Sequence, residues 1–273
     1  DPFSEAEEAK WKAQAICKAA WNYSPASKTI HSPRGSNSVS IHPIPPVTQS
    51  IQRLIEGQDT DLVPASKPHT AEPIRWYPGL ELPNTTTSRV LFVDNLDSFS
   101  WNIVHALSTL EAEVVIVPGR QISPPPKQLI EDLKPTHIVL GPGPGRPEQS
   151  PLTMQFAKSA IQGKTPPLLG ICLGHQAIGL AAGWTLAPTE YGAVHGVPDG
   201  IQSGDLLQIM TRYHSLALTP NNDILRVTAT DSATNKLVMA IQHPEWPVSG
   251  VQYHPESAGS VGGLSILADF LSQ

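Results

Sequence analysis

The chain has 273 residues, of which 40% are apolar and 15% are charged. This composition supplies enough hydrophobic material for a sizeable core and has too little charge for a disordered chain. The 18 basic and 24 acidic side chains leave a formal net charge of -6. Binding of nucleic acid needs clustered Lys and Arg, so nucleic acid is not an expected partner.

Membrane, disulfide and metal-binding signals are weak in this sequence. No run approaches the roughly 18 consecutive apolar residues of a membrane span, and residues 1–5 lack the pattern of a signal peptide. We therefore expect a cytoplasmic protein with no membrane partner. The two cysteines, Cys17 and Cys172, form neither a disulfide framework nor a zinc-binding spacing. The ten histidines include no H-E-x-x-H motif, and no metal or other cofactor is predicted in this chain.

The first third of the chain differs in composition from the rest. The residues before 89 hold 11 of the 28 prolines but only 3 of the 20 glycines. Residues 4–7 have the capping-box pattern S-E-A-E, and apolar residues then recur at helical spacing, which predicts an amphipathic helix over 5–21 within a first segment, 1–23. Residues 24–88 carry ten prolines and many Ser and Thr residues, which is typical of a proline-rich linker.

From residue 89 onward, strand-length apolar runs alternate with helical stretches. Short runs rich in Val, Ile and Leu predict buried strands over 90–93, 114–117, 137–140 and 168–172. Helices are predicted after a cap at Ser98, and over 151–161, 175–182 and 263–271. Further strands are predicted in quick succession over 206–210, 225–230, 237–241 and 248–253. The sequence thus predicts one α/β domain over 89–273, with a largely parallel central sheet flanked by helices and an antiparallel extension.

The most informative stretch is P-L-L-G-I-C-L-G-H-Q over 167–176, a predicted strand that leads through a turn into a helix. Gly170 and Gly174 stand two residues on either side of Cys172, which is the spacing of a nucleophile elbow. Such a turn is expected to expose the sulfur above the sheet, and the positive end of the next helix favours a thiolate. The backbone N–H of Leu173 is a predicted oxyanion donor. Core packing is the alternative role for a lone cysteine after an apolar strand, and the flanking glycines favour the nucleophile.

A cysteine nucleophile needs a base, and V-Q-Y-H-P-E-S over 251–257 offers one at the end of a predicted strand. In an extended chain His254 and Glu256 project to the same side, so the carboxylate can accept the imidazole N–H and hold its tautomer. The same tripeptide at 243–245 is interpreted as part of a hairpin turn. The sequence therefore predicts a catalytic triad of these two side chains with Cys172.

The third signal is G-P-G-P-G-R-P over 141–147, directly after the predicted strand 137–140. Its alternating prolines remove N–H donors that a phosphate-binding loop would need. Glycine lets a backbone amide approach a ligand closely, so Gly143 is a candidate for the second oxyanion donor. A plain Pro-Gly turn is the alternative.

These motifs together resemble the class I (triad) glutamine amidotransferase domain, and within it the amidotransferase component of anthranilate synthase and aminodeoxychorismate synthase. The resemblance covers 89–273 and rests also on D-N-L-D-S-F at 94–99 and M-T-R-Y-H-S-L at 210–216. It implies that Cys172 attacks the side-chain amide of L-glutamine, while His254 shuttles a proton to departing ammonia and Glu256 orients His254. It also implies that the glutamine and its oxyanion are contacted by Gly143, Pro144, Gly145, Leu173, Gln176, Ser215 and Leu216.

The resemblance further implies a partner, a chorismate-converting synthase domain or subunit that uses the ammonia and requires Mg²⁺ for its own chemistry. Residues 1–23 resemble the closing helix of such a synthase, which would make this chain the C-terminal part of a fused polypeptide; an unrelated amphipathic helix is the alternative. Val197 stands where many relatives carry Lys, and A-G-S at 258–260 also departs from the family pattern, without an expected contact to the triad. Two other functions stay open, a γ-glutamyl peptide hydrolase and a non-catalytic partner-binding domain.

Overall fold

The computed structural model describes residues 74–76, 88–122 and 124–273. The compact unit that contains them runs from Thr70 to Gln273. The helix predicted over 5–21 and most of the predicted linker lie outside the described residues. Within the described part, no helix is long and apolar enough to cross a membrane.

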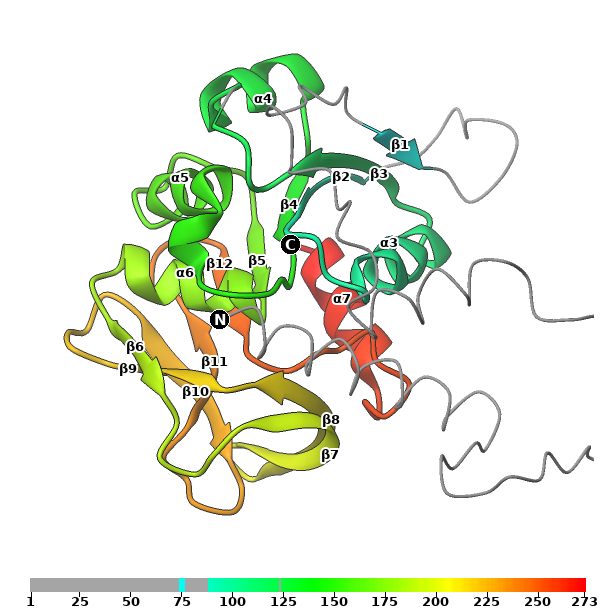
Figure 1. Ribbon diagram of the computed structural model, residues 1–273. Helices are drawn as coiled ribbons and strands as arrows, with labels where there is room; N and C mark the ends of the chain where they lie inside the picture. Colours follow the sequence, from blue (N-terminus) through cyan, green and yellow to red (C-terminus); the bar gives the residue numbers. More distant parts are fainter. Residues whose placement is uncertain (1–73, 77–87, 123) are drawn as a thin grey trace, which may run out of the picture. The chain divides into compact units, whose positions relative to one another are not determined.

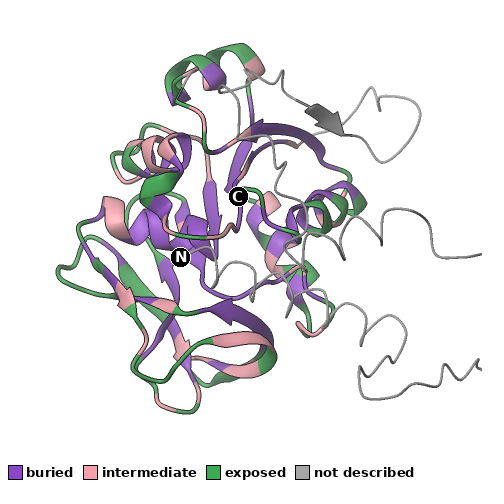
Figure 2. Ribbon diagram, in the orientation of Figure 1, coloured by how far each residue is buried: buried purple, intermediate pink, exposed green. Residues whose placement is uncertain are grey.

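A ten-stranded sheet forms the centre of the described residues, in the strand order β1-β3-β2-β4-β5-β12-β11-β10-β7-β8 (Figure 1). Five neighbouring strands are mutually parallel: β3 (Glu113–Pro118), β2 (Arg89–Asp94), β4 (His137–Leu140), β5 (Leu168–Ile171) and β12 (Val248–Val251). Their runs of Val, Ile and Leu are buried because helices cover both faces of a parallel sheet. Figure 2 shows these strands as the buried centre of the domain.

The sheet continues antiparallel beyond β12, through β11 (Val238–Gln242), β10 (Arg226–Asp231), β7 (Val194–Ser203) and β8 (Leu206–His214). A separate two-stranded sheet pairs β6 (Thr185–Pro188) with β9 (Leu216–Thr219). The α/β class with an antiparallel extension is therefore confirmed. β12 belongs to both parts, since it runs parallel to β5 and antiparallel to β11.

Several strands were not predicted from the sequence. β6, β7 and β9 are short or contain polar residues, Gly and Pro, so their apolar pattern is weak, and pairing with neighbouring strands decides their structure. β1 (Ile74–Trp76) lies in the range predicted as linker and pairs antiparallel with β3.

Helices form a layer on each face of the sheet (Figure 1). One layer contains α3 (Ser100–Thr109) and α7 (Gly263–Leu271), and the other contains α4 (Pro126–Leu133), α5 (Pro151–Ala160) and α6 (Leu173–Ala181). Alternate residues of β2 serve the two layers: Val90 and Phe92 belong to the core cluster with α3 and α7, while Leu91 and Val93 belong to the other cluster. α4 was not predicted, and the cap of α3 is Phe99 instead of Ser98.

Candidate active site

Cys172 lies at the corner between β5 and α6. Its φ of 52° and ψ of -101° put it in a region that non-glycine residues rarely adopt, at a cost of about 1–3 kcal/mol. Two hydrogen bonds hold this corner: the Cys172 N–H donates to the Val251 carbonyl (2.8 Å), and the Cys172 carbonyl accepts from the Gln176 N–H (3.0 Å). Strained backbone at a strand-to-helix turn is the geometry of a nucleophile elbow.

The two flanking glycines are required by the close approach of α6 to the sheet. A Cβ on Gly170 would lie 2.5 Å from the backbone carbon of Gly174, and a Cβ on Gly174 would overlap the carbonyl oxygen of Leu140 at the end of β4. The corner therefore brings residue 174 down onto residue 170 and onto the neighbouring strand. Both positions of the G-x-C-x-G spacing therefore need glycine because a side chain there would collide with neighbouring backbone atoms, in addition to the conformational freedom that glycine gives the turn.

The thiol is less exposed than the sequence suggested. Cys172 is only 7% exposed, so the expectation of an exposed sulfur was wrong. The reason is that neighbouring segments cover the sulfur: Sγ donates to the Tyr213 carbonyl at 3.7 Å and accepts from Gln252 Nε2 at 3.6 Å. Gln252 was not singled out from the sequence, although a glutamine in a buried apolar run is a usable signal, because buried amides require partners.

His254 and Glu256 form a buried pair beside this corner. His254 Nδ1 lies 2.7 Å from Glu256 Oε1, and the two side chains are 1% and 0% exposed. β12 ends at Val251, so the pair lies beyond the strand and not within it. Its backbone is held instead by an isolated bridge to Thr211, whose carbonyl accepts the His254 N–H at 2.9 Å.

Residues 258–260 also hold the histidine, contrary to the expectation that they would not touch the triad. The Ser260 hydroxyl donates to the His254 carbonyl at 2.6 Å and accepts from the Thr211 N–H at 2.9 Å. The segment that departs from the family pattern thus fixes the backbone of His254.

The electrostatics of His254 link it to both neighbours. Burial lowers the pKa of His254, but the Glu256 carboxylate and the Cys172 sulfur as a thiolate outweigh burial and raise that pKa well above 6.5. Nδ1 is bonded to Glu256, whereas Nε2 has no hydrogen-bond partner among the described residues and is the nitrogen left for the sulfur. The structure therefore brings Cys172, His254 and Glu256 together.

The second His-Pro-Glu tripeptide has a different environment. His243 Nδ1 accepts from the backbone N–H groups of Glu245 and Trp246, both at 3.1 Å. Burial lowers the pKa of His243, with only partial opposition from Glu245. Its side chain therefore closes a turn, as the sequence predicted, and its carboxylate neighbour does not hold the ring.

The loop after β4 is fixed by Asn95, a buried residue that directly follows β2. Asn95 Nδ2 donates to the Gly141 carbonyl at 2.9 Å, and Asn95 Oδ1 accepts from the Thr153 hydroxyl at 2.7 Å. A Cβ on Gly143 would lie 2.6 Å from the Asn95 carbonyl oxygen, so only glycine fits this position. Gly145 has a φ of 79°, in the left-handed region that favours glycine. The loop that contains Gly143, Pro144 and Gly145 thus lies at the carboxyl edge of the strand beside β5.

The remaining predicted substrate residues lie on α6, at Ser215 between β8 and β9, and at Leu216, the first residue of β9. Leu173 is the first residue of α6, so its N–H has no acceptor within the helix. Gln176 Nε2 donates to the Leu216 carbonyl (3.4 Å) and to Gln252 Oε1 (3.1 Å). Ser215 is exposed, and Leu216 is partly buried. Gln176 therefore connects the Leu216 backbone, through Gln252, to the Cys172 sulfur.

The carboxyl ends of β2, β4, β5 and β12 therefore supply most of the site, which is where ligands bind in open α/β sheets. Within the described residues, no group of three or more His, Cys, Asp or Glu side chains is arranged to hold a metal ion. The fold and site define an α/β protein with a cysteine at a strained elbow and a buried His-Glu pair next to it.

Comparison with known proteins identifies the family. Residues 91–273 match the family described as glutamine amidotransferase class-I. The chain therefore belongs to the class I glutamine amidotransferase family, and the resemblance seen in the sequence is confirmed.

Three relatives each match 67% of the chain. Anthranilate synthase component 2 of Mycobacterium tuberculosis is 39% identical over 202 residues, which cover 67% of this chain and 82% of the relative. Aminodeoxychorismate synthase component 2 of Escherichia coli is 33% identical over 189 residues, covering 67% and 98%. The Bifunctional protein TrpGD of Thermotoga maritima is 37% identical over 196 residues, covering 67% and 32%.

A solved structure supports the fold. A Thermoplasma acidophilum protein, described as a putative GMP synthase subunit, superposes with a TM-score of 0.57 at 21% identity, covering 68% of this chain and 92% of that one. At this level of identity the likeness concerns the fold.

Proposed function

We propose that this domain hydrolyses the side-chain amide of L-glutamine and supplies the released ammonia to a chorismate-converting synthase. The observation that carries the proposal is the buried 2.7 Å bond between His254 and Glu256 beside the Cys172 thiol. A thiol next to an imidazole that is oriented by a carboxylate is the arrangement of an activated cysteine nucleophile.

The first half of the reaction transfers the glutamyl group to sulfur. Cys172 attacks the carboxamide carbon as a thiolate, with its former proton on His254 Nε2. The carbonyl oxygen then carries the negative charge and accepts hydrogen bonds from the N–H groups of Leu173 and Gly143. As the tetrahedral intermediate collapses, Nε2 gives its proton to the departing nitrogen. Ammonia leaves, and a γ-glutamyl thioester remains on Cys172.

The second half restores the enzyme. Water attacks the thioester carbon while His254 Nε2 accepts a proton from it. Collapse of this second tetrahedral intermediate breaks the C–S bond, which releases glutamate and the thiolate. Glu256 stabilises the imidazolium in both halves, because its carboxylate accepts a hydrogen bond from the Nδ1–H group.

Substrate orientation is assigned to the groups around this centre. Gln176, Ser215 and Leu216 face the α-amino and α-carboxyl groups of glutamine, and residues 143–145 line the oxyanion side. The ammonia acceptor is a chorismate-converting synthase domain or subunit. This assignment is supported by relatives named as component 2 of anthranilate synthase and of aminodeoxychorismate synthase.

Glutamate release from glutamine, measured with the full chain and a synthase present, tests the proposal. The Cys172→Ser variant should lose at least about 10⁴-fold in kcat, because loss of a member of a catalytic triad costs about 10⁴- to 10⁶-fold. Equal rates for wild type and variant would exclude Cys172 as the nucleophile. If γ-glutamyl peptides were hydrolysed with a kcat/KM well above that for glutamine, the domain would be a peptide hydrolase instead.

A further inference from the structure

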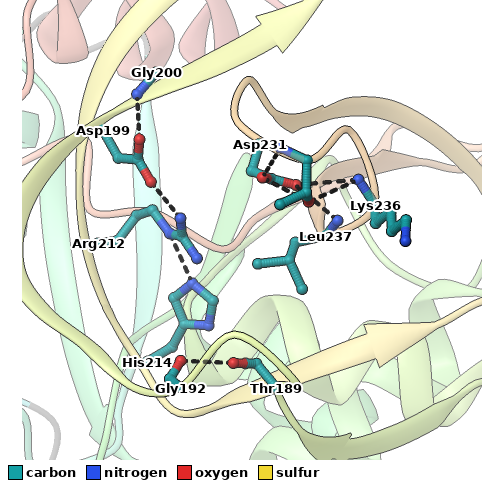
Figure 3. A network of polar contacts seen from close by, with 10 residues as sticks. Thr189, Gly192, Asp199, Gly200, Arg212, His214, Asp231, Lys236 and Leu237 are labelled. Carbon is teal, nitrogen blue, oxygen red and sulfur yellow. Dashed lines mark hydrogen bonds and ion pairs between the residues drawn. The ribbon is translucent and has the colours of Figure 1, made fainter.

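A buried arginine is connected to the proposed glutamine site by hydrogen bonds through His214. Arg212 belongs to β8, and its side chain is only 4% exposed. Its Nη1 donates to Asp199 Oδ2 on the partner strand β7, and its Nε donates to His214 Nε2 at 3.0 Å (Figure 3). Asp199 is itself fixed, because its other oxygen accepts the Gly200 N–H at 2.8 Å.

Arg212 decides which nitrogen of His214 carries the proton. A guanidinium has no acceptor atom, so His214 Nε2 must accept the Arg212 hydrogen bond. The single proton of the neutral ring is then on Nδ1, which donates to the Leu216 carbonyl at 2.9 Å. Burial and the Arg212 charge lower the pKa of His214 to about 4, against the raising effect of the Leu216 carbonyl. At neutral pH, His214 is therefore an uncharged donor with one fixed tautomer.

The Leu216 carbonyl is held from a second direction. Gln176 Nε2 donates to the same oxygen at 3.4 Å and also donates to Gln252, which reaches the Cys172 sulfur. The neighbouring Ser215 carbonyl accepts the Thr189 N–H at 3.0 Å. A continuous series of hydrogen bonds thus runs from Asp199 to the nucleophile, and the segment 215–216 lies in the middle of it.

We propose that Arg212 is a positioning residue for substrate binding: by fixing the Nδ1–H tautomer of His214, it holds the Leu216 carbonyl and so the backbone that receives the α-groups of glutamine. Without Arg212, the Nε2–H tautomer becomes accessible. It would point the lone pair of Nδ1 at the Leu216 oxygen and displace segment 215–216. This inference depends on the proposed glutaminase function.

Labelling of Cys172 by two electrophiles separates substrate positioning from general distortion. A glutamine-analogue electrophile such as 6-diazo-5-oxo-L-norleucine carries the α-groups, whereas iodoacetamide does not. Site-resolved mass spectrometry on the full chain follows Cys172 separately from Cys17, and gives KI and the maximal rate for each reagent. The variants are Arg212→Met, Arg212→Lys and the double variant Arg212→Met with His214→Asn.

The expected result is a change in KI for one reagent only. Arg212→Met should raise the KI of the glutamine analogue about tenfold, equivalent to about 1.4 kcal/mol, while the iodoacetamide rate stays within about twofold. Arg212→Lys keeps the charge beside Asp199 but loses the planar fork of donors, so an intermediate KI is expected. In the double variant, an Asn amide nitrogen takes the place of Nδ1 and has no tautomer, so the KI should return toward the wild-type value.

Arg89→Met is the matched control. Arg89 lies at the start of β2, is also part-buried, and also binds a carboxylate, that of Glu113. This variant should leave both labelling reactions unchanged. The positioning role would be overturned by an unchanged KI of the glutamine analogue in Arg212→Met, or by equally slowed labelling of Cys172 with both reagents. It would also be overturned if the KI of the double variant were as high as that of the single variant. If Arg212→Met does not fold, Arg212→Lys decides in the same way. If the wild type neither hydrolyses glutamine nor reacts selectively with the analogue, the proposed function itself fails.

Discussion

The Glu256→Gln substitution tests the catalytic arrangement most directly. The substitution keeps the size of the side chain but removes its charge, at a bond of 2.7 Å between side chains that are 1% and 0% exposed. A hydrogen bond to a charged group contributes about 1.5–3 kcal/mol, and loss of that amount from the transition state lowers kcat/KM about 10- to 100-fold. We expect this loss for glutamine hydrolysis, measured as glutamate release.

The chain supplies its own control for this experiment. Glu245 occurs in the same His-Pro-Glu tripeptide, but His243 bonds there to backbone N–H groups instead of a carboxylate. Glu245→Gln should therefore leave kcat/KM within about twofold of wild type, as is usual for surface changes away from a site. If both substitutions reduced kcat/KM equally, or if neither did, the assignment of His254 as a base oriented by Glu256 would be refuted.

The pH dependence gives a second measure of the same pair. Because Glu256 helps to raise the pKa of His254, the imidazolium persists to a higher pH than that of an ordinary histidine and is lost as pH rises through that pKa. Glu256→Gln should move the alkaline limb of the kcat/KM profile to lower pH. The stability that the His254–Glu256 pair contributes is present below pH 6.5 and is lost as pH rises through the raised pKa of His254. The difference in unfolding free energy between the wild type and Glu256→Gln should therefore shrink at alkaline pH.

Two further predictions concern stability, measured as the free energy of unfolding in urea. Gly174→Ala should lower it by about 1–3 kcal/mol, because the new methyl group would overlap the Leu140 carbonyl; a change below about 0.5 kcal/mol would mean that α6 does not approach β4 this closely. Burial holds the pKa values of His175 and His214 at about 3 and about 4, so as pH falls below 6.5 the unfolded chain binds protons first. Each histidine should then lower the free energy of unfolding by up to about 1.4 kcal/mol for every pH unit between pH 6.5 and 4. His214→Asn should reduce this slope, and equal stability at pH 7 and pH 5 would contradict buried, neutral rings.

The sequence by itself determined the class of fold and predicted the candidate residues of the site. Local physical rules were sufficient for this: buried parallel strands require apolar runs, and an elbow at Cys172 requires glycine two residues before and after it. His254 and Glu256 could be paired from their spacing, because a carboxylate two residues away in an extended chain reaches the ring. The family resemblance then followed from motifs that each occupy a few consecutive residues.

Only the tertiary structure decided how these pieces meet. The sulfur is buried because Tyr213 and Gln252 cover it, and these residues come from segments far apart in the chain. Weakly patterned strands such as β7 are stabilised by partners across the sheet, which no local period reveals. The proton on Nδ1 of His214 follows from an arginine two residues away, on a strand whose side-chain direction depends on its pairing. Contacts between distant segments depend on the packing of the whole domain, and a linear pattern does not record them.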